Sequence, residues 1–243
     1  MDFPKLSLNT TWYYQLQGTL NLNLPAKVYD VDLFDTSVEE IQQLKKEGKI
    51  VICYFSAGTF ENWRPDADKF TKDVIGNPLT DWEGEYWLDI RSSLVRKIMK
   101  ERLELAKNKG CDGVEPDNVD AYLHNTGFNL TYKDQFDYNR FLAIEAKKLG
   151  LLVGLKNDLE QIKDLVDYFD FAINEQCHQY HECDKLKPFI EEDKPVFNVE
   201  YDKIYVNNQT AFKQLCNQSK EENIRTIVLS PLLDGSIIKS CDW

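Results

Sequence analysis

Hydrophobic runs alternate with amphipathic stretches along most of this chain. Eight of the runs are short, rich in aromatic or β-branched residues and bounded by turn residues, a pattern that predicts β-strands. The run at 49–58, KIVICYFSAG, is apolar throughout, as in parallel strands buried on both faces. The predicted strands are residues 11–18, 26–34, 49–58, 112–120, 151–158, 169–177, 195–202 and 226–233.

Amphipathic segments follow most of these runs. Val38, Ile41 and Leu44 recur at helical spacing after the capping residues 35–37, and Gly48 ends the segment. We expect further helices at residues 93–110, 132–150, 159–169 and 211–223. The segment 59–90 contains Trp63, Trp82, Tyr86 and Trp87 and is expected to be a long loop.

Strands that alternate with helices over 243 residues predict one domain, residues 1–243, with a (β/α)8 TIM-barrel fold. A doubly wound open sheet is the alternative, but its Gly-rich phosphate turn is missing after the first strand, where QLQGTLNLN stands. In a barrel, the active site lies at the C-terminal ends of the strands. We therefore place the chemistry there.

The densest polar cluster is DGVEPDNVD, residues 112–120. Pro116 with Gly113 close by argues against a helix, since an interior Pro costs about 3 kcal/mol. A strand that ends in a polar turn fits better, although a solvated acidic loop is the alternative. Polar residues fall at the ends of the other predicted strands too. This ring consists of Asp30, Asp32, Tyr54, Ser56, residues 115–118, residues 156–158, Asn174, Glu175 and residues 200–202.

The formal net charge of -12 argues against nucleic acid, which needs clustered Lys and Arg. It is compatible with a cationic partner, or with a charge that serves only solubility. No apolar run approaches the roughly 20 residues of a membrane span, so no membrane partner is expected. We expect a monomer.

Six cysteines and four N-x-S/T sequons, at Asn9, Asn129, Asn208 and Asn217, favour a secreted or lysosomal glycoprotein with disulfide bonds. Cys177 with Cys183 is the expected local pair, Cys216 with Cys241 a second, and Cys53 is interpreted as a buried thiol. Zinc held by the HQYH run between Cys177 and Cys183 is the less favoured alternative. Met1 is followed by DFPKLSLN rather than a signal peptide, so either a leader has been removed or this compartment is wrong.

Carboxylates and aromatic residues at a barrel mouth, without a metal or phosphate motif, suit glycoside hydrolysis without a cofactor. That reaction needs one carboxylate as nucleophile or base and one carboxylic acid to protonate the leaving oxygen. Trp87 and Tyr54 would stack against sugar faces, although such aromatic residues more often serve packing.

The motifs YDVDLFDTS, ICYFSAGTFENWRPDADKF, WEGEYWLDIR, GCDGVEPDNVDAY, GLKND, FAINEQCHQYHECD and KPVFNVEY occur in this order. Together they resemble glycoside hydrolase family 114, the endo-α-1,4-polygalactosaminidases, from about residue 12 to residue 201. The resemblance implies a TIM-barrel hydrolase that cuts inside chains of α-1,4-linked galactosamine. It also implies two essential acids, which fall on Asp117 and Glu175.

We hypothesise that Asp117, beside Asn118 and Lys156, stays ionised as the nucleophile, and that Glu175 is the general acid and later the base. The expected partner is a cationic galactosamine-containing polysaccharide. The expected substrate-binding residues are Asp30, Asp32, Tyr54, Trp87, Glu115, Asn118, Lys156, Asn157, Glu200 and Tyr201. Several of the extra acids would either hold the ammonium group of the sugar or form only structural hydrogen bonds at the strand ends. A non-catalytic carbohydrate-binding barrel and a hydrolase for another amino-sugar glycan are the alternatives.

Overall fold

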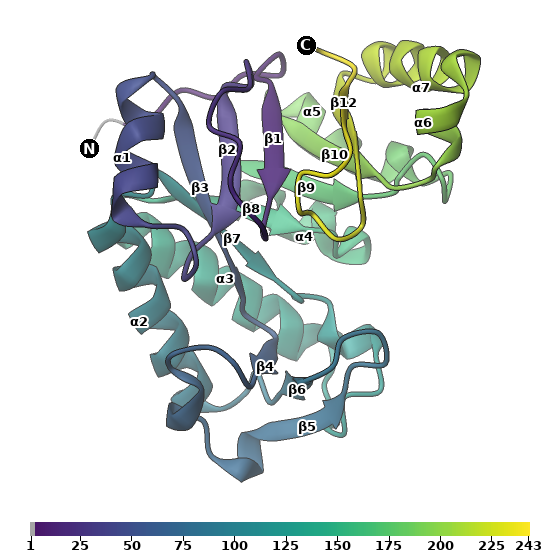
Figure 1. Ribbon diagram of the computed structural model, residues 1–243. Coiled ribbons are helices and arrows are strands. Elements are labelled where there is room, and N and C mark those ends of the chain that lie inside the picture. Colours follow the sequence, from purple (N-terminus) through teal and green to yellow (C-terminus); the bar gives the residue numbers. More distant parts are fainter. Residues whose placement is uncertain (1–2) are drawn as a thin grey trace.

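Eight parallel strands form the main sheet of the computed structural model, which describes residues 3–243 (Figure 1). Each strand overlaps one of the eight predicted from the sequence and bonds to the next one along the chain within the sheet. In spatial order they are β1 (Trp12–Gln15), β2 (Val28–Asp32), β3 (Ile50–Ser56), β7 (Gly113–Asp117), β8 (Leu152–Lys156), β9 (Phe171–Glu175), β10 (Val196–Glu200) and β11 (Ile224–Leu229).

The main sheet is curled, but β1 and β11, the first and last of the eight parallel strands, form no backbone ladder with each other. The closed barrel predicted from the sequence is therefore not confirmed. A ninth strand, β12 (Ile238–Ser240), pairs antiparallel with β11 on the edge that closure would require. Contact between β1 and β11 instead includes the Trp12 indole Nε1, which donates to the Arg225 carbonyl at 3.0 Å. The fold is an α/β arrangement with a curled, mostly parallel sheet.

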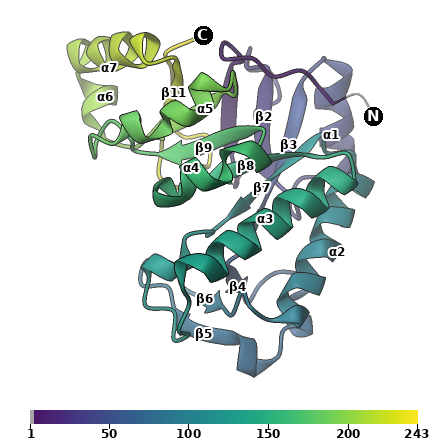
Figure 2. The ribbon, with the colours of Figure 1, turned by 180° about the vertical axis from the view of Figure 1, so that it is seen from behind.

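Helices cover the outer face of the sheet, as the view from behind shows (Figure 2). A capping box of Ser37 and Glu40 starts α1, and Thr131 with Asp134 does the same for α3. The α-helices are α1 (Val38–Lys46), α2 (Ser93–Lys109), α3 (Tyr132–Lys148), α4 (Ile162–Leu165), α5 (Lys187–Glu191), α6 (Ile204–Asn207) and α7 (Gln209–Glu221). Single 3-10 turns are Ala67–Lys69, Lys72–Val74, Ala121–Leu123, Leu159–Gln161, Val166–Tyr168 and Cys183–Leu186.

Two connections differ from a regular alternation of strand and helix. Within the described residues, β1 passes to β2 through irregular backbone instead of a helix. The segment expected to be one long loop contains a small antiparallel sheet, in the order β4 (Thr59–Glu61), β6 (Glu85–Leu88) and β5 (Ile75–Pro78). These strands have only three or four residues each, which is too short for a clear alternation of apolar and polar positions. The small sheet stands beyond the C-terminal end of β3.

The interior of the curled sheet is filled by aromatic side chains. Trp12 stacks on Phe197 at a centroid distance of 5.4 Å, and Phe197 contacts Phe171 at 5.7 Å. A Cβ added to Gly154 would lie 2.3 Å from the Phe171 ring, so only glycine fits beside it. Burial of these large rings supplies much of the hydrophobic free energy of this core.

Three disulfides join the six cysteines. The expected bonds Cys177–Cys183 and Cys216–Cys241 are both present. The interpretation of Cys53 as a buried thiol is wrong, because it bonds from β3 to Cys111, two residues before the neighbouring strand β7. The predicted barrel already makes the strands at 49–58 and 112–120 neighbours, but strand order alone does not show that the two sulfurs meet.

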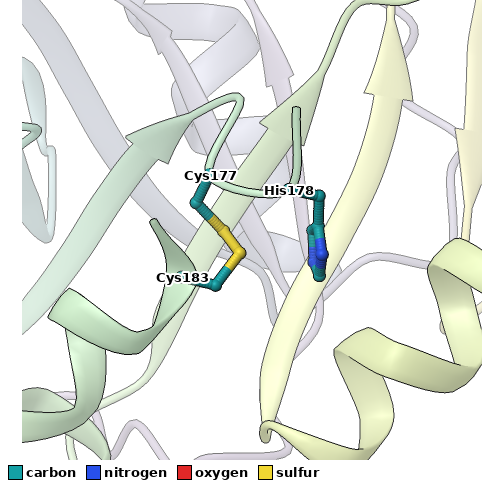
Figure 3. A group of neighbouring side chains, drawn as sticks. All are labelled: Cys177, His178 and Cys183. Atoms are coloured by element: carbon teal, nitrogen blue, oxygen red, sulfur yellow. A yellow bond between two sulfur atoms is a disulfide. The ribbon is translucent and has the colours of Figure 1, made fainter. Parts of the chain in front are cut away.

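The disulfide between Cys177 and Cys183 argues against the alternative of a zinc site at His178. The His178 ring lies close to the sulfurs of Cys177 and Cys183 (Figure 3). Because those sulfurs are bonded to each other, they have no thiolate to offer a metal. His178 Nε2 lies 2.8 Å from the Ser219 hydroxyl. We therefore interpret this group as structural.

None of the helices in residues 3–243 combines the length and apolarity that a membrane crossing would require.

Candidate active site

Three adjacent strands end in charged side chains that face one cleft. Asp117 ends β7, Lys156 ends β8 and Glu175 ends β9. The next residue of each strand, Asn118, Asn157 or Gln176, has a positive φ of 58°, 49° or 63°. Non-glycine residues seldom adopt this backbone, and such strain often clusters at functional sites. The chain thus turns sharply directly after each charged group.

Lys156 lies between the two predicted catalytic acids. Its Nζ is 3.5 Å from Asp117 Oδ1, 3.5 Å from Glu175 Oε1 and 2.8 Å from Glu115 Oε2. The lysine side chain is 2% exposed, whereas those of Asp117 and Glu175 are 19% and 31% exposed. The acids therefore reach the cleft while the cation that they share stays beneath them.

A tyrosine hydroxyl also binds each acid. Tyr54 donates to Asp117 Oδ2 at 2.9 Å, and Tyr201 donates to Glu175 Oε2 at 2.5 Å. Asn157 Nδ2 lies 3.3 Å from Glu175 Oε1 as a further donor. Burial, followed by the charge of the neighbouring acid, raises the pKa of both tyrosines well above the ordinary value, so both remain donors. The orientation of the two carboxylates is fixed before any ligand arrives.

These contacts set the charge of the site. Burial raises the pKa of Glu175, but the Lys156 charge and the hydrogen bonds from Tyr201 and Asn157 outweigh it, and the pKa is lowered overall. Burial lowers the pKa of Lys156, but Asp117, Glu115 and Glu175 together raise it well above its ordinary value. The free site therefore favours an ionised Glu175 and a charged Lys156.

A second layer of polar groups supports Lys156 from below. Tyr14 donates to Glu115 Oε2 at 2.9 Å, and Lys156 Nζ donates to the Tyr14 oxygen at 2.9 Å. Asp30 is buried beside Glu115, and the Glu115 carboxyl is the one hydrogen-bond partner of its carboxyl group within residues 3–243. Burial first, and then the charge of Glu115, raises the pKa of Asp30 well above the usual value. These effects favour the protonated form of Asp30.

Three of the predicted substrate-binding acids are thus placed away from the cleft surface. Asp30 and Glu115 are buried under Lys156, and neither lines the cleft. Glu200 is also buried, and it accepts hydrogen bonds from Asn198 and from the backbone after β9 at His178 and Gln179. This placement favours positioning roles for the three acids over contact with a sugar.

The other nine predicted residues do meet at one cleft, whose volume is about 680 Å³. They are Asp32, Tyr54, Trp87, Asp117, Asn118, Lys156, Asn157, Glu175 and Tyr201. Trp87 is 7% exposed and its ring stacks on His124 at 4.8 Å, so little of the ring is open to a sugar. The open aromatic surfaces belong to Trp63 and Trp82, which line the cleft and are 51% and 50% exposed.

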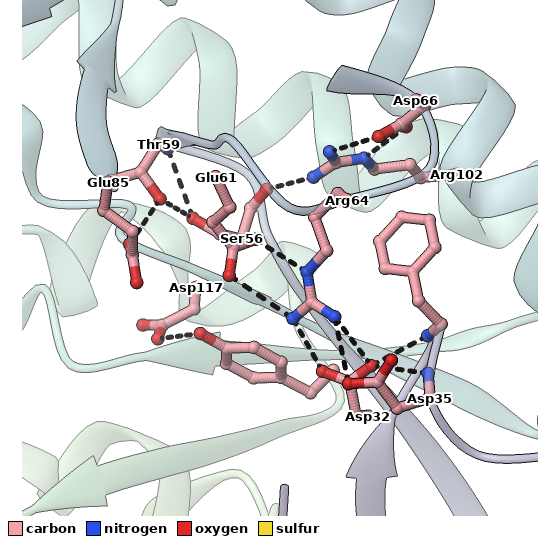
Figure 4. A network of polar contacts seen from close by, with 12 residues as sticks. Asp32, Asp35, Ser56, Thr59, Glu61, Arg64, Asp66, Glu85, Arg102 and Asp117 are labelled. Atoms are coloured by element: carbon pink, nitrogen blue, oxygen red, sulfur yellow. Dashed lines mark hydrogen bonds and ion pairs between the residues drawn. The ribbon is translucent and has the colours of Figure 1, made fainter. Parts of the chain in front are cut away.

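One wall of the cleft is a polar network, most of which sequence reasoning missed (Figure 4). Arg64 forms ion pairs with Asp32 at 2.7 Å, Glu61 at 3.2 Å and Asp35 at 3.4 Å. Glu85 from β6 accepts a hydrogen bond from the Thr59 hydroxyl at 2.9 Å. Asp32 ends β2 and was predicted from the sequence. Glu61, Arg64 and Glu85 lie in the small sheet and its connections, where the only sequence signal was the density of tryptophan.

The network is linked to the turn after Asp117. Asn118 Nδ2 donates to the Ser56 hydroxyl at 2.8 Å, and Ser56 in turn contacts Thr59. A Cβ on Gly58 would lie 1.7 Å from the Asn118 carbonyl oxygen, so the two backbones approach as closely as glycine allows. The small sheet is thereby held against the end of β7.

Comparison with known proteins agrees with this arrangement. The model of glycoside-hydrolase family GH114 matches residues 3–242. The crystal structure of Aspergillus fumigatus Ega3 in complex with galactosamine is 38% identical, with a TM-score of 0.91, and the match covers 99% of this chain and 100% of that one. The glycoside hydrolase domain of PelA from Pseudomonas aeruginosa has a TM-score of 0.75 over 95% of this chain and 98% of its own, and at 14% identity it shows the fold alone.

A curated relative matches less of the chain. The uncharacterized protein MJ1477 of Methanocaldococcus jannaschii is 33% identical over 130 residues, which are 48% of this chain and 38% of that protein. The match thus spans less than half of that relative. The family model, in contrast, covers almost every residue, and on that ground the chain belongs to glycoside hydrolase family GH114.

Proposed function

We propose that this chain is a glycoside hydrolase that cuts inside polymers of α-1,4-linked galactosamine. The observation that carries the proposal is the pair Asp117 and Glu175, which end β7 and β9 and share Lys156 at 3.5 Å each. Two carboxylates that face one cleft are what glycoside hydrolysis requires. The choice of sugar is supported by the 38% identity to a structure described as a complex with galactosamine.

The proposed roles are those of a retaining hydrolase. Asp117, held by Lys156 and Tyr54, attacks the anomeric carbon as a carboxylate. Glu175 donates its proton to the leaving oxygen and then removes a proton from the water that hydrolyses the glycosyl ester. Because the pKa of Glu175 is lowered in the free protein, its protonated form is scarce at neutral pH. We therefore expect the highest activity in acid, where the sugar amines are also charged.

The cleft supports a polymeric, cationic substrate. Its lining acids include Asp35, Asp81 and Asp120 in addition to the proposed catalytic pair, so the local field favours an ammonium sugar. Trp63 and Trp82 expose about half of their surface at the cleft and provide faces on which successive sugars stack. Tyr54, Asn118, Lys156, Asn157 and Tyr201 are the proposed contacts near the cleavage point.

The test is the release of reducing ends from deacetylated α-1,4-galactosaminan, with products identified by mass. The wild type should release a ladder of oligomers, while Asp117→Asn and Glu175→Gln should each lose at least about 1,000-fold in kcat and keep the fold. Early products with the α configuration would support retention. Carboxyl groups about 5 to 5.5 Å apart fit that outcome, whereas a gap of about 6.5 to 9.5 Å goes with inversion.

Two alternatives are separated by the same assay. A non-catalytic carbohydrate-binding barrel would bind the polymer without releasing reducing ends. A hydrolase for another amino-sugar glycan would be inactive on galactosaminan and active on that other polymer. The intact pair of acids and its shared lysine favour turnover over binding alone.

We further propose that the protein is secreted. Its six cysteines form three disulfides, as expected for an oxidising compartment. The four sequon asparagines, Asn9, Asn129, Asn208 and Asn217, are exposed and therefore open to glycosylation. No feature of residues 3–243 favours the lysosomal alternative. Mass spectrometry before and after glycosidase treatment tests the modification.

A further inference from the structure

The buried acids of the cleft are matched to nearby cations, with one exception. Arg64 forms ion pairs with Asp32 and Glu61 and a longer one with the exposed Asp35. Lys156 forms ion pairs with Glu115, Asp117 and Glu175. Asp120 lies 3.4 Å from His124. Glu85 has no ion pair within residues 3–243, although it is only 8% exposed.

One oxygen of Glu85 is held and the other is free. Oε2 accepts from the Thr59 hydroxyl at 2.9 Å, and Thr59 is fixed in turn by Ser56. Oε1 has no hydrogen-bond partner among the described residues, and it is not sealed from solvent but faces the cleft that Glu85 lines. Burial, followed by the charges of Glu61 and Asp117, raises the pKa of Glu85 to about 7. About half of this group is therefore protonated at pH 7, and a positive charge placed beside it would favour the carboxylate form.

We propose that Glu85 binds the ammonium group of a galactosamine unit beside the cleavage point and thereby selects deacetylated over N-acetylated sugar. This inference rests on the proposed function and adds the residue that recognises the amine. An ammonium supplies both a hydrogen bond for Oε1 and the missing charge, and a charge-assisted bond in a partly buried site is among the stronger polar contacts. A sugar hydroxyl would supply the bond without the charge.

The surroundings explain why an acetylated amine would not do the same. An N-acetyl group is neutral, so it leaves the carboxylate among Glu61 and Asp117 without compensation, and it needs more room than an ammonium. The charge of Arg64 lowers the pKa of Glu85, but the Arg64 guanidinium is already shared by three other acids. Selectivity at this point then comes from an unpaired charge that only the deacetylated sugar satisfies.

The test measures binding of galactosamine and N-acetylgalactosamine oligomers of equal length by calorimetry. Binding is measured in the Glu175→Gln background, so that no oligomer is cleaved. Adding Glu85→Gln keeps the shape and the acceptor for Thr59 but removes the charge. We expect this substitution to weaken the affinity for the galactosamine oligomer about tenfold or more. The affinity for the acetylated oligomer should change less than about twofold. Glu83→Gln, at an exposed acid two residues away, is the matched control and should leave both affinities unchanged.

Each outcome is decisive. Selective loss of affinity for the galactosamine oligomer supports the role of Glu85, and circular dichroism of the variant checks that it is folded. An equal change with both oligomers, or no change with either, would overturn the inference while the proposed function stands. If the wild type releases no reducing ends from galactosaminan, the proposed function fails, and this inference falls with it.

Discussion

The Tyr201 hydroxyl donates a 2.5 Å hydrogen bond to Glu175 Oε2. This bond helps the Lys156 charge to hold the pKa of Glu175 below its ordinary value against the effect of burial. If Glu175 is the general acid, activity falls on the alkaline side as this carboxyl loses its proton. The Tyr201→Phe variant removes the hydrogen bond, so the pKa of Glu175 rises.

We therefore predict that Tyr201→Phe moves the alkaline limb of the kcat/KM profile to higher pH. Reducing-end release measured between pH 3 and pH 8 checks this, and Tyr180→Phe, at an exposed ring, should leave the profile in place. An unchanged alkaline limb accompanied by a raised acidic limb would mean that Glu175 works in its ionised form. The roles of the two acids would then have to be exchanged.

Lys156 is predicted to matter for stability as well as for activity. Replacing it with Met leaves Glu115, which is fully buried, and the two cleft acids without their cation. Loss of one partner from a buried ion pair typically costs about 3 to 5 kcal/mol of unfolding free energy. Urea denaturation of Lys156→Met should show a loss of this size, and kcat/KM should fall at least about 100-fold.

A double variant separates the charge effect from lost packing. Adding Glu115→Gln to Lys156→Met removes the closest unpaired charge and should restore part of the stability, because the two groups are coupled. Lys148→Met, which breaks only an exposed pair with Glu145, should change stability by less than about 1 kcal/mol. If the double variant is less stable than Lys156→Met, the charge argument fails.

The strand ends could be predicted from the sequence, and the wall of the cleft could not. Asp117, Lys156 and Glu175 each end a strand that the sequence predicts, and parallel strands bring their C-terminal ends to one edge. Asp30 and Glu115 lie one layer lower, because each precedes the last residue of its strand by two positions and so points to the same face about 7 Å deeper. One-dimensional spacing does not reveal that depth.

Contacts between distant segments account for the other differences. The small sheet has strands of three or four residues, and Glu85 is placed by Thr59 from another strand. The bond between Cys53 and Cys111 depends on β3 and β7 being neighbours although the small sheet and α2 separate them in sequence. The open edge between β1 and β11 depends on β12, a strand too short to be detected by periodicity.

The disulfides should differ in their contribution to stability according to the loops that they close. Cys53 and Cys111 are 58 residues apart, whereas Cys177 and Cys183 are only 6 apart. Loop-closure entropy gives about 4 kcal/mol for the first bond and about 2 kcal/mol for the second. Urea denaturation of the paired Cys→Ala variants should therefore find the larger loss for Cys53 and Cys111. The reverse order would show that native-state packing outweighs chain entropy here.

Asp158 should make the protein less stable as the pH rises. Burial, and then the charge of Asp120, raises the pKa of Asp158 from 3.8 to about 9 in the folded protein. Between those values the folded chain keeps a proton that the unfolded chain has lost, so the free energy of unfolding falls with pH by at most about 1.4 kcal/mol per unit. The Asp158→Asn variant removes this titration and should flatten the decline in urea denaturation at pH 5, 7 and 8.5. Asp167→Asn, at an exposed position, should keep the wild-type slope. A slope that is equally steep in Asp158→Asn would assign the pH dependence to other buried groups, with Asp30 the first to examine because burial also raises the pKa of its carboxyl.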